Sequence, residues 1–187
     1  FAGFRMTAEE FYELPDDSSR YELINGVVVM SPRPVPAHQK VAAEIFTQLH
    51  LFLRGNPIGH VFYEMDVLLN SGVRGEDDLV YKPDVIFVRA DEPVSPNQRL
   101  SLSPDLVVEV VSRGTRKRDT IQKRADYERF GVREYWIVDP ERESVTLLRL
   151  SDGKFTEVDC RGDDFASEAV PTFVLDVRPI RAAFKPW

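Results

Sequence analysis

The sequence predicts an α/β protein of the α+β kind, in which a central mixed β-sheet is flanked by helices and preceded by an N-terminal β-hairpin. Two apolar runs, residues 84–88 and 106–111, have the length and composition of buried strands. A charged helix over residues 117–130 separates them from a further pair of strands. Strands interrupted by a helix favour a mixed sheet over a sandwich or a bundle.

The N-terminal residues predict a short helix and then a hairpin. Thr7 is followed three positions later by Glu10, which is the pattern of a capping box at a helix start. Residues 21–30 are two short apolar stretches around Asn25 and Gly26, a pair that favours the positive φ angles of a tight hairpin turn. We therefore expect the chain to enter the core after a small separate hairpin.

The main helix is predicted over residues 38–54. Val41, Ile45, Leu49 and Phe52 recur there at helical spacing and form a stripe that can pack on a sheet. The other expected elements are a strand over 61–69, a helix end at Gly131, and a hairpin of residues 134–139 and 144–150.

The length predicts one domain over residues 1–187, because 187 residues leave little room for two cores. Its expected parts are a helix and hairpin over 7–31, a core over 38–150, and a C-terminal extension of short strands and loop over 151–187.

Composition excludes several classes of protein. The chain is 43% hydrophobic and 29% charged, which is typical of globular proteins and not of disordered or fibrous ones. The lone Cys160 excludes an intramolecular disulfide and a multi-cysteine zinc site, and His50 and His60 have no matching ligands. Without an apolar run long enough for a membrane helix or the pattern of a signal peptide, we expect a cytoplasmic protein.

The net charge of −7 opposes binding to nucleic acid unless basic residues gather on one face. It does not exclude a nuclease, because a cleft of carboxylates that awaits Mg²⁺ is itself negative.

Glu109 is the most informative residue. It lies within the apolar run 106–111, where an unpaired charge would be strongly destabilising. It therefore ligates a metal, pairs with a cation or takes up a proton; the alternative is an edge strand whose side chain reaches water.

Asp84 begins the other apolar run. Alone, a Pro-Asp pair at a strand start is common turn chemistry. Two acids on successive core strands can also converge on one Mg²⁺, which prefers one or two carboxylates plus waters. Asp84 and Glu109 are thus the candidate metal ligands.

Lys123 shares a predicted helix face with Tyr127 and Phe130, so its side chain is expected to point towards the sheet. It either neutralises Glu109 or stands beside the metal and stabilises charge on a reacting phosphate. Glu22, on the hairpin, is a third catalytic carboxylate or a solvated residue.

A group of residues is placed to contact nucleic acid. His38, at the helix start, orients a phosphate or caps the helix at the surface. The basic patch that follows the Glu109 strand either meets phosphates or is a solvated helix entry; it consists of Arg113, Arg116, Lys117 and Arg118.

Taken together, these pieces resemble the Uma family, a restriction-endonuclease-like branch of the PD-(D/E)XK nuclease superfamily, from about Met6 to Leu150. The matching stretches are Tyr21-Glu-Leu-Ile-Asn-Gly26, Ser31-Pro32 with His38, 82–88 (KPDVIFV), 104–112 (PDLVVEVVS), Asp119 through Lys123 to Tyr127, and 131–140 (GVREYWIVDP). Their common order carries the resemblance.

The resemblance implies a restriction-endonuclease-like core in which Asp84 and Glu109 bind Mg²⁺ or Mn²⁺. Val111 occupies the position of the superfamily's usual lysine, and Lys123 is then the migrated lysine. The chain departs from the family at Arg113-Gly114, where Pro-Ser is usual, and at Val28, where an acid is frequent.

The first functional hypothesis is a metal-dependent endonuclease that hydrolyses DNA phosphodiester bonds, working as a homodimer so that two clefts meet two strands. The second is a catalytically silent nuclease fold that serves as a DNA-binding or oligomeric module. A third is a metal-dependent hydrolase of another phosphate ester.

Overall fold

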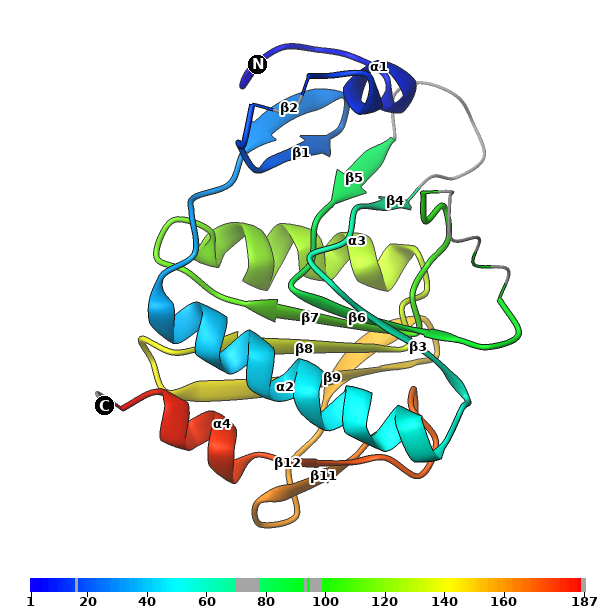
Figure 1. Cartoon of the computed structure of the whole chain (residues 1–187), viewed down its shortest axis with the longest axis vertical. Helices are drawn as coiled ribbons and strands as arrows, with labels where there is room; N and C mark the ends of the chain where they lie inside the picture. The colour runs from blue at the N-terminus through cyan, green and yellow to red at the C-terminus, as the bar shows by residue number, and fades with distance from the viewer. Residues whose placement is uncertain (16, 70–77, 93, 95–98, 186–187) are drawn as a thin grey trace.

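A mixed six-stranded sheet forms the centre of the molecule, as the sequence predicts (Figure 1). The computed structural model describes residues 1–15, 17–69, 78–92, 94 and 99–185. Strands β7 and β8 are parallel and the other neighbours antiparallel. In sheet order the strands are β10 (Lys154–Glu157), β9 (Ser144–Ser151), β8 (Glu134–Asp139), β7 (Leu106–Val110), β6 (Val85–Arg89) and β3 (Gly59–Tyr63).

Helices cover both faces of this sheet. On one face lie α2 (Pro36–Gly55) and α4 (Arg178–Ala183), and on the other η1 (Arg118–Lys123) and α3 (Arg124–Arg129). Val41, Ile45 and Leu49 of α2 pack in one core cluster with sheet residues that include Phe87 and Trp136. The predicted apolar stripe is therefore the contact surface of α2.

Helix α2 begins two residues earlier than predicted. The three prolines before His38 predict a break in regular secondary structure, but Pro36 is the first residue of the helix. Proline suits that position because it donates no hydrogen bond and its φ angle is already helical.

A smaller sheet with α1 (Ala8–Tyr12) lies at one end of the molecule (Figure 1). Its strands are β2 (Val27–Met30), β1 (Tyr21–Ile24), β5 (Leu79–Tyr81) and β4 (Val67–Leu69), in that order. The capping box is confirmed, since Thr7 N donates to Glu10 Oε2 at 2.8 Å and Glu10 N donates to Thr7 Oγ1 at 3.2 Å. Asn25 and Gly26 have φ angles of 51° and 71°, as the predicted turn requires.

The prediction of a single strand over residues 61–69 is wrong. The segment forms β3 of the central sheet and β4 of the small sheet. Glu64 separates them with a φ of 49°, and its N–H donates to the carbonyl of Asp84 at 3.1 Å. An apolar pattern does not reveal that a chain changes sheets at one polar residue.

The predicted helix over 117–130 forms, but its first part, η1, is π-helical. Two side-chain hydroxyls donate to backbone carbonyls that would accept backbone N–H groups in an α-helix. The Thr120 hydroxyl donates to Arg116 O at 2.8 Å, and the Tyr135 hydroxyl donates to Asp119 O at 2.9 Å. Such insertions accompany a widened helical turn. The helix ends as predicted at Gly131, whose φ is 78°.

The C-terminal extension completes one side of the core. The predicted hairpin is present as β8 and β9, which pair antiparallel. Strands β11 (Asp164–Ala166) and β12 (Val174–Asp176) lead to the helix α4, so the prediction of only short strands and loop over 151–187 is wrong there. Phe165, Leu175 and Ile180 join the core beneath α2. None of the helices in the described part of the chain has the length and apolar character needed to cross a bilayer.

Candidate functional site

A pocket open to solvent lies where the small sheet, the start of α2 and the central sheet meet. Among the residues that line it are Arg20, Glu22, His38, Asp84, Glu109 and Lys123. The structure thus brings most of the predicted site residues to one place.

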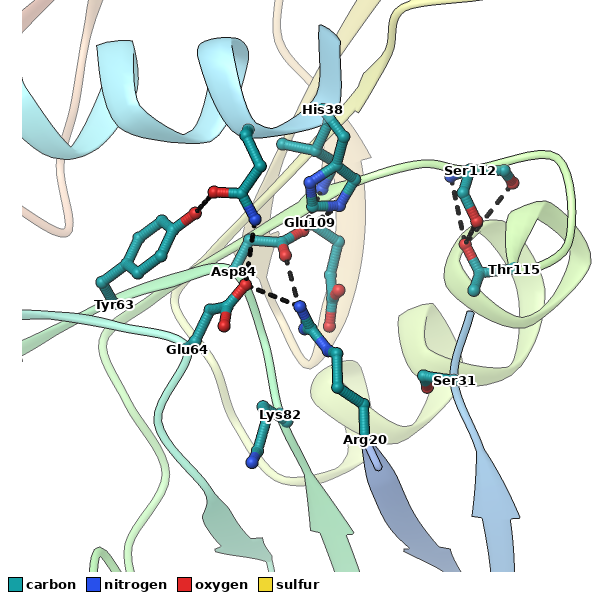
Figure 2. Close-up of polar contacts among 12 residues, drawn as sticks. Arg20, Ser31, His38, Tyr63, Glu64, Lys82, Asp84, Glu109, Ser112 and Thr115 are labelled. Atoms are coloured by element: carbon teal, nitrogen blue, oxygen red, sulfur yellow. Dashed lines mark hydrogen bonds and ion pairs between the residues drawn. The ribbon is translucent and has the colours of Figure 1, made fainter. Parts of the chain in front are cut away.

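Asp84 and Glu109 are brought together by strand register. Val85 of β6 is opposite Val108 of the antiparallel β7, so Asp84 and Glu109 come next in the same register. Directly opposed residues have Cβ atoms about 4.5–5.5 Å apart. Figure 2 shows the two side chains next to each other.

The Glu109 carboxylate is buried, with 4% of its surface exposed, so the alternative that it reaches water is wrong. Its Oε1 accepts from Lys123 Nζ at 2.7 Å and from the Tyr127 hydroxyl at 3.0 Å. Burial raises the pKa of Glu109 well above its usual range; Lys123 opposes this rise, and nearby carboxylates add to it. Burial and the neighbouring carboxylates therefore outweigh the one ammonium that contacts Glu109.

Asp84 is held rigidly at the mouth of β6. Its Oδ2 accepts the N–H of Val110 at 2.7 Å and lies 3.2 Å from His38 Nε2, whereas its Oδ1 is 3.8 Å from Arg20 Nη2. His38 is only 7% exposed, so the alternative of a surface histidine is wrong. The contact fixes His38 beside the candidate ligand rather than out in solvent.

Lys123 lies inside the site, as the helix face predicts. Its side chain is 4% exposed, and Nζ is 2.7 Å from both Glu109 Oε1 and Glu22 Oε1 and 3.8 Å from Asp119 Oδ1. Burial acts to lower the pKa of Lys123, but the three carboxylates outweigh it and raise that pKa above its usual value. The ammonium is therefore a permanent charge at neutral pH and not a proton acceptor.

Glu22 is buried at 2% exposure, so it is not a solvated hairpin residue. Its Oε1 accepts from Lys123 and from the N–H of Lys82 at 3.1 Å, and its Oε2 from Ser31 at 2.9 Å and Arg118 at 3.1 Å. Burial raises its pKa, but Lys123 and these hydrogen bonds lower it overall. Both oxygens are engaged, which leaves Glu22 poorly placed to ligate a metal.

The predicted basic patch is largely engaged by neighbouring acids. Arg116 binds Asp139 through two hydrogen bonds of 2.8 and 3.0 Å. Arg118 turns inward to Glu22, whereas Arg113 and Lys117 are exposed. Arg113 also lies 3.4 Å from Glu141, so Lys117 is the exposed patch residue for which the described contacts show no acidic partner.

Asp119 and Arg20 line the pocket but were not among the site residues predicted from the sequence. Asp119 is buried at 2%, and desolvation by burial raises its pKa to about 6. Its position four residues before Lys123 on a helix was the available signal. Arg20 gave a weaker signal, since it only adjoins the stretch that contains Glu22.

The fold and this acid pair define a restriction-endonuclease-like α/β protein. The model of the Uma2 family, described as "Putative restriction endonuclease", matches residues 8–178, and the chain belongs to that family. The resemblance and the fold class inferred from the sequence are thereby confirmed.

A solved structure from Anabaena variabilis, titled a "putative nuclease belonging to DUF820", is similar with a TM-score of 0.75 and 18% sequence identity. The similarity covers 96% of this chain and 99% of that one. At this identity the match establishes the fold. No curated protein matches the chain.

Proposed function

We propose that this protein is a metal-dependent nuclease that hydrolyses DNA phosphodiester bonds, with Asp84 and Glu109 as ligands of Mg²⁺ or Mn²⁺. The observation that carries the proposal is that both carboxylates line the pocket, one position beyond the paired residues Val85 and Val108, with Lys123 against Glu109. Family membership supports the same class of activity.

The residues fit a hard divalent ion. Among the described contacts, Glu109 Oε2 accepts no hydrogen bond, and the nearest cation to Asp84 Oδ1 is 3.8 Å away. In the described part of the chain, no group of three or more His, Cys, Asp or Glu residues is arranged to hold a metal ion. A pair of carboxylates completed by water and substrate oxygens suits Mg²⁺.

The metal, when bound, supplies Lewis acidity that polarises a phosphoryl oxygen and stabilises the leaving oxygen. Lys123 keeps the Glu109 carboxylate in position and places a fixed positive charge where negative charge develops on the phosphate. His38 restrains Asp84 from the α2 side.

A second reading is favoured by one contact. The 2.7 Å pair of Lys123 and Glu109 is also what a catalytically silent fold would use for structural neutralisation. Such a protein would act as a DNA-binding or oligomeric module.

Plasmid nicking separates these readings. Wild-type protein should nick supercoiled plasmid in Mg²⁺ or Mn²⁺ and not in EDTA. Glu109→Gln should neither nick the plasmid nor bind Mn²⁺ in a calorimetric titration. Glu157→Gln, which changes an exposed glutamate on β10, is the matched control and should behave as wild type. Metal binding without nicking of plasmid or linear duplex would support the silent module.

We also propose a homodimer, since cutting two strands is simplest with two clefts related by a twofold axis. Light scattering at micromolar concentration tests it, and a monomer there would remove the idea.

A further inference from the structure

A phosphate bound in this pocket would need a positively charged side chain that is not already paired with an acid. Four carboxylates line it, and Lys123 is already bound between two of them. Lys82, also at the pocket, lies 3.2 Å from Asp66. A phosphate approaching these acids therefore needs another positive group.

Arg20 is a pocket cation whose hydrogen-bond donors are only partly used. Its Nη1 donates to Glu64 at 2.6 Å, but Nη2 is 3.8 Å from Asp84, beyond hydrogen-bond distance. Its Nε is buried and has no hydrogen-bond partner in the described structure. A buried donor without an acceptor is destabilising, and it marks a place where a water, an anion or another acceptor is expected.

Two other arginines show how the Nε and Nη2 groups of a guanidinium bind a carboxylate together. Arg116 binds Asp139 through Nε and Nη2 at 2.8 and 3.0 Å. Arg178 binds Asp176 with the same two atoms at 2.9 and 2.7 Å. In Arg20 the Nη1 end of the guanidinium is anchored on Glu64, whereas Nε has no acceptor in the described structure and Nη2 is 3.8 Å from Asp84.

We propose that Arg20 binds the substrate phosphate, with Nε–H and Nη2–H each donating to one non-bridging oxygen. The planar guanidinium matches two oxygens of a phosphate. Because Arg20 Nη2 lies 3.8 Å from Asp84 Oδ1, one phosphate can contact both Arg20 and the metal site. That the phosphate belongs to nucleic acid rests on the proposed function.

Glu64 is the positioning residue for Arg20. The Tyr63 hydroxyl donates to Gln39 at 2.5 Å, Gln39 donates to Glu64 at 3.4 Å, and Glu64 accepts from Arg20 Nη1. Tyr63, Glu64 and Arg20 are labelled in Figure 2. The positive φ of Glu64, at the change from β3 to β4, directs it to this role. These contacts fix the Nη1 end of the guanidinium, so Nε and Nη2 are preorganised for their ligand.

The test compares Arg20→Met with Arg178→Met, which removes an exposed arginine far along the chain. Inorganic phosphate is titrated into each Mg²⁺-loaded protein by calorimetry. We expect Arg20→Met to weaken phosphate binding by about tenfold or more, and Arg178→Met to leave it unchanged. The Mn²⁺ isotherm of Arg20→Met should be no weaker than wild type, because a cation near Asp84 has been removed.

Two further variants keep the test decisive if Arg20→Met folds poorly. Arg20→Lys keeps the positive charge but loses the two parallel N–H donors of the guanidinium. Glu64→Gln weakens the ion pair that holds Arg20 in place. Both variants should bind phosphate more weakly than wild type. Equal phosphate affinity in wild type and in the folded Arg20 variant, or no phosphate binding by wild type, overturns the proposal.

Plasmid nicking distinguishes this proposal from the function on which it rests. Arg20→Met should lower kcat by about 10²–10³-fold, and an unchanged kcat overturns the role of Arg20. If wild type binds phosphate through Arg20 and nicks no DNA, the phosphate site stands and the proposed nuclease function fails.

Discussion

Lys123 Nζ lies 2.7 Å from Glu109 Oε1, although the two residues are 14 positions apart and lie on different elements. Parallel strands need a crossover connection, and here η1 and α3 make it between β7 and β8. The crossover passes over the sheet face that carries Glu109. The topology of one parallel pair therefore delivers the lysine to the acid.

Replacing Lys123 with Met should lower stability strongly in EDTA. The ammonium neutralises Glu22 and Glu109 in a buried setting, and removing one partner of a buried ion pair costs about 3–5 kcal/mol. Mn²⁺ should restore part of that loss, because the ion supplies positive charge beside the same carboxylates. Thermal melts with and without Mn²⁺ measure both effects.

The same variant should bind Mn²⁺ and yet nick plasmid about 10²–10³-fold more slowly than wild type, since the fixed charge near the phosphate is gone. Nicking at the wild-type rate would assign Lys123 to structure alone. Lys185→Met, at an exposed position near the C-terminus, is the control.

Glu22→Gln tests whether Glu22 positions Lys123 or ligates the metal. Its two oxygens accept four hydrogen bonds, so the amide should leave the Mn²⁺ isotherm unchanged. It should lower kcat, because Lys123 and Arg118 lose a charged partner. Loss of Mn²⁺ binding in a folded Glu22→Gln protein would instead make Glu22 a ligand.

Much of the fold could be predicted because its signals are local. The stripe from Val41 to Leu49, the Asn25-Gly26 turn and the apolar run around Glu109 each depend on neighbours in sequence. The break at Glu64 could not be predicted in this way. It arises because the chain leaves one sheet for another, and the stabilising contact is with Asp84, far along the chain.

The candidate site could be predicted where burial conflicts with charge. Glu109 and Lys123 stand out because a charge on an apolar face demands a partner. Arg20 and Asp119 do not stand out, since each lies among polar neighbours in sequence. The predicted basic patch shows where sequence-based prediction fails for exposed charges. Arg116 is paired with Asp139, and the sequence alone does not reveal which acid lies opposite an arginine.

Stability should depend on pH through Asp139. Burial raises its pKa, but the hydrogen bonds from Arg116 and from backbone N–H groups lower it overall. A carboxyl with a lowered folded-state pKa stabilises the fold above its unfolded value of 3.8, and that contribution is lost as pH falls through the folded-state pKa. Asp139→Asn should therefore destabilise the protein by about 1–2 kcal/mol near neutral pH.

The difference between wild type and Asp139→Asn should shrink as the pH falls below about 4. Urea unfolding at a series of pH values measures it. Asp159→Asn, an exposed substitution, should track wild type at every pH. A difference that stays constant to low pH would show that the ion pair with Arg116 does not stabilise the fold.

Gly59 at the start of β3 should tolerate no side chain. A Cβ there would meet two Phe87 ring carbons and the Val88 carbonyl oxygen closer than atoms can approach. Because β3 pairs with β6 along its whole length, the strand must move or Phe87 must leave its packed position. Gly59→Ala should thus lower the unfolding free energy by about 1–3 kcal/mol.

Gly55→Ala is the matched control, because a Cβ at the end of α2 meets nothing within 4 Å. Alanine also favours helix, so that variant should be neutral or more stable by up to about 1 kcal/mol. Urea unfolding of both variants gives the comparison. Since β3 leads directly to Glu64, Gly59→Ala should also loosen the anchor of Arg20 and weaken phosphate binding. Equal stability of the two variants would mean that β3 is not fixed against β6 as the structure shows.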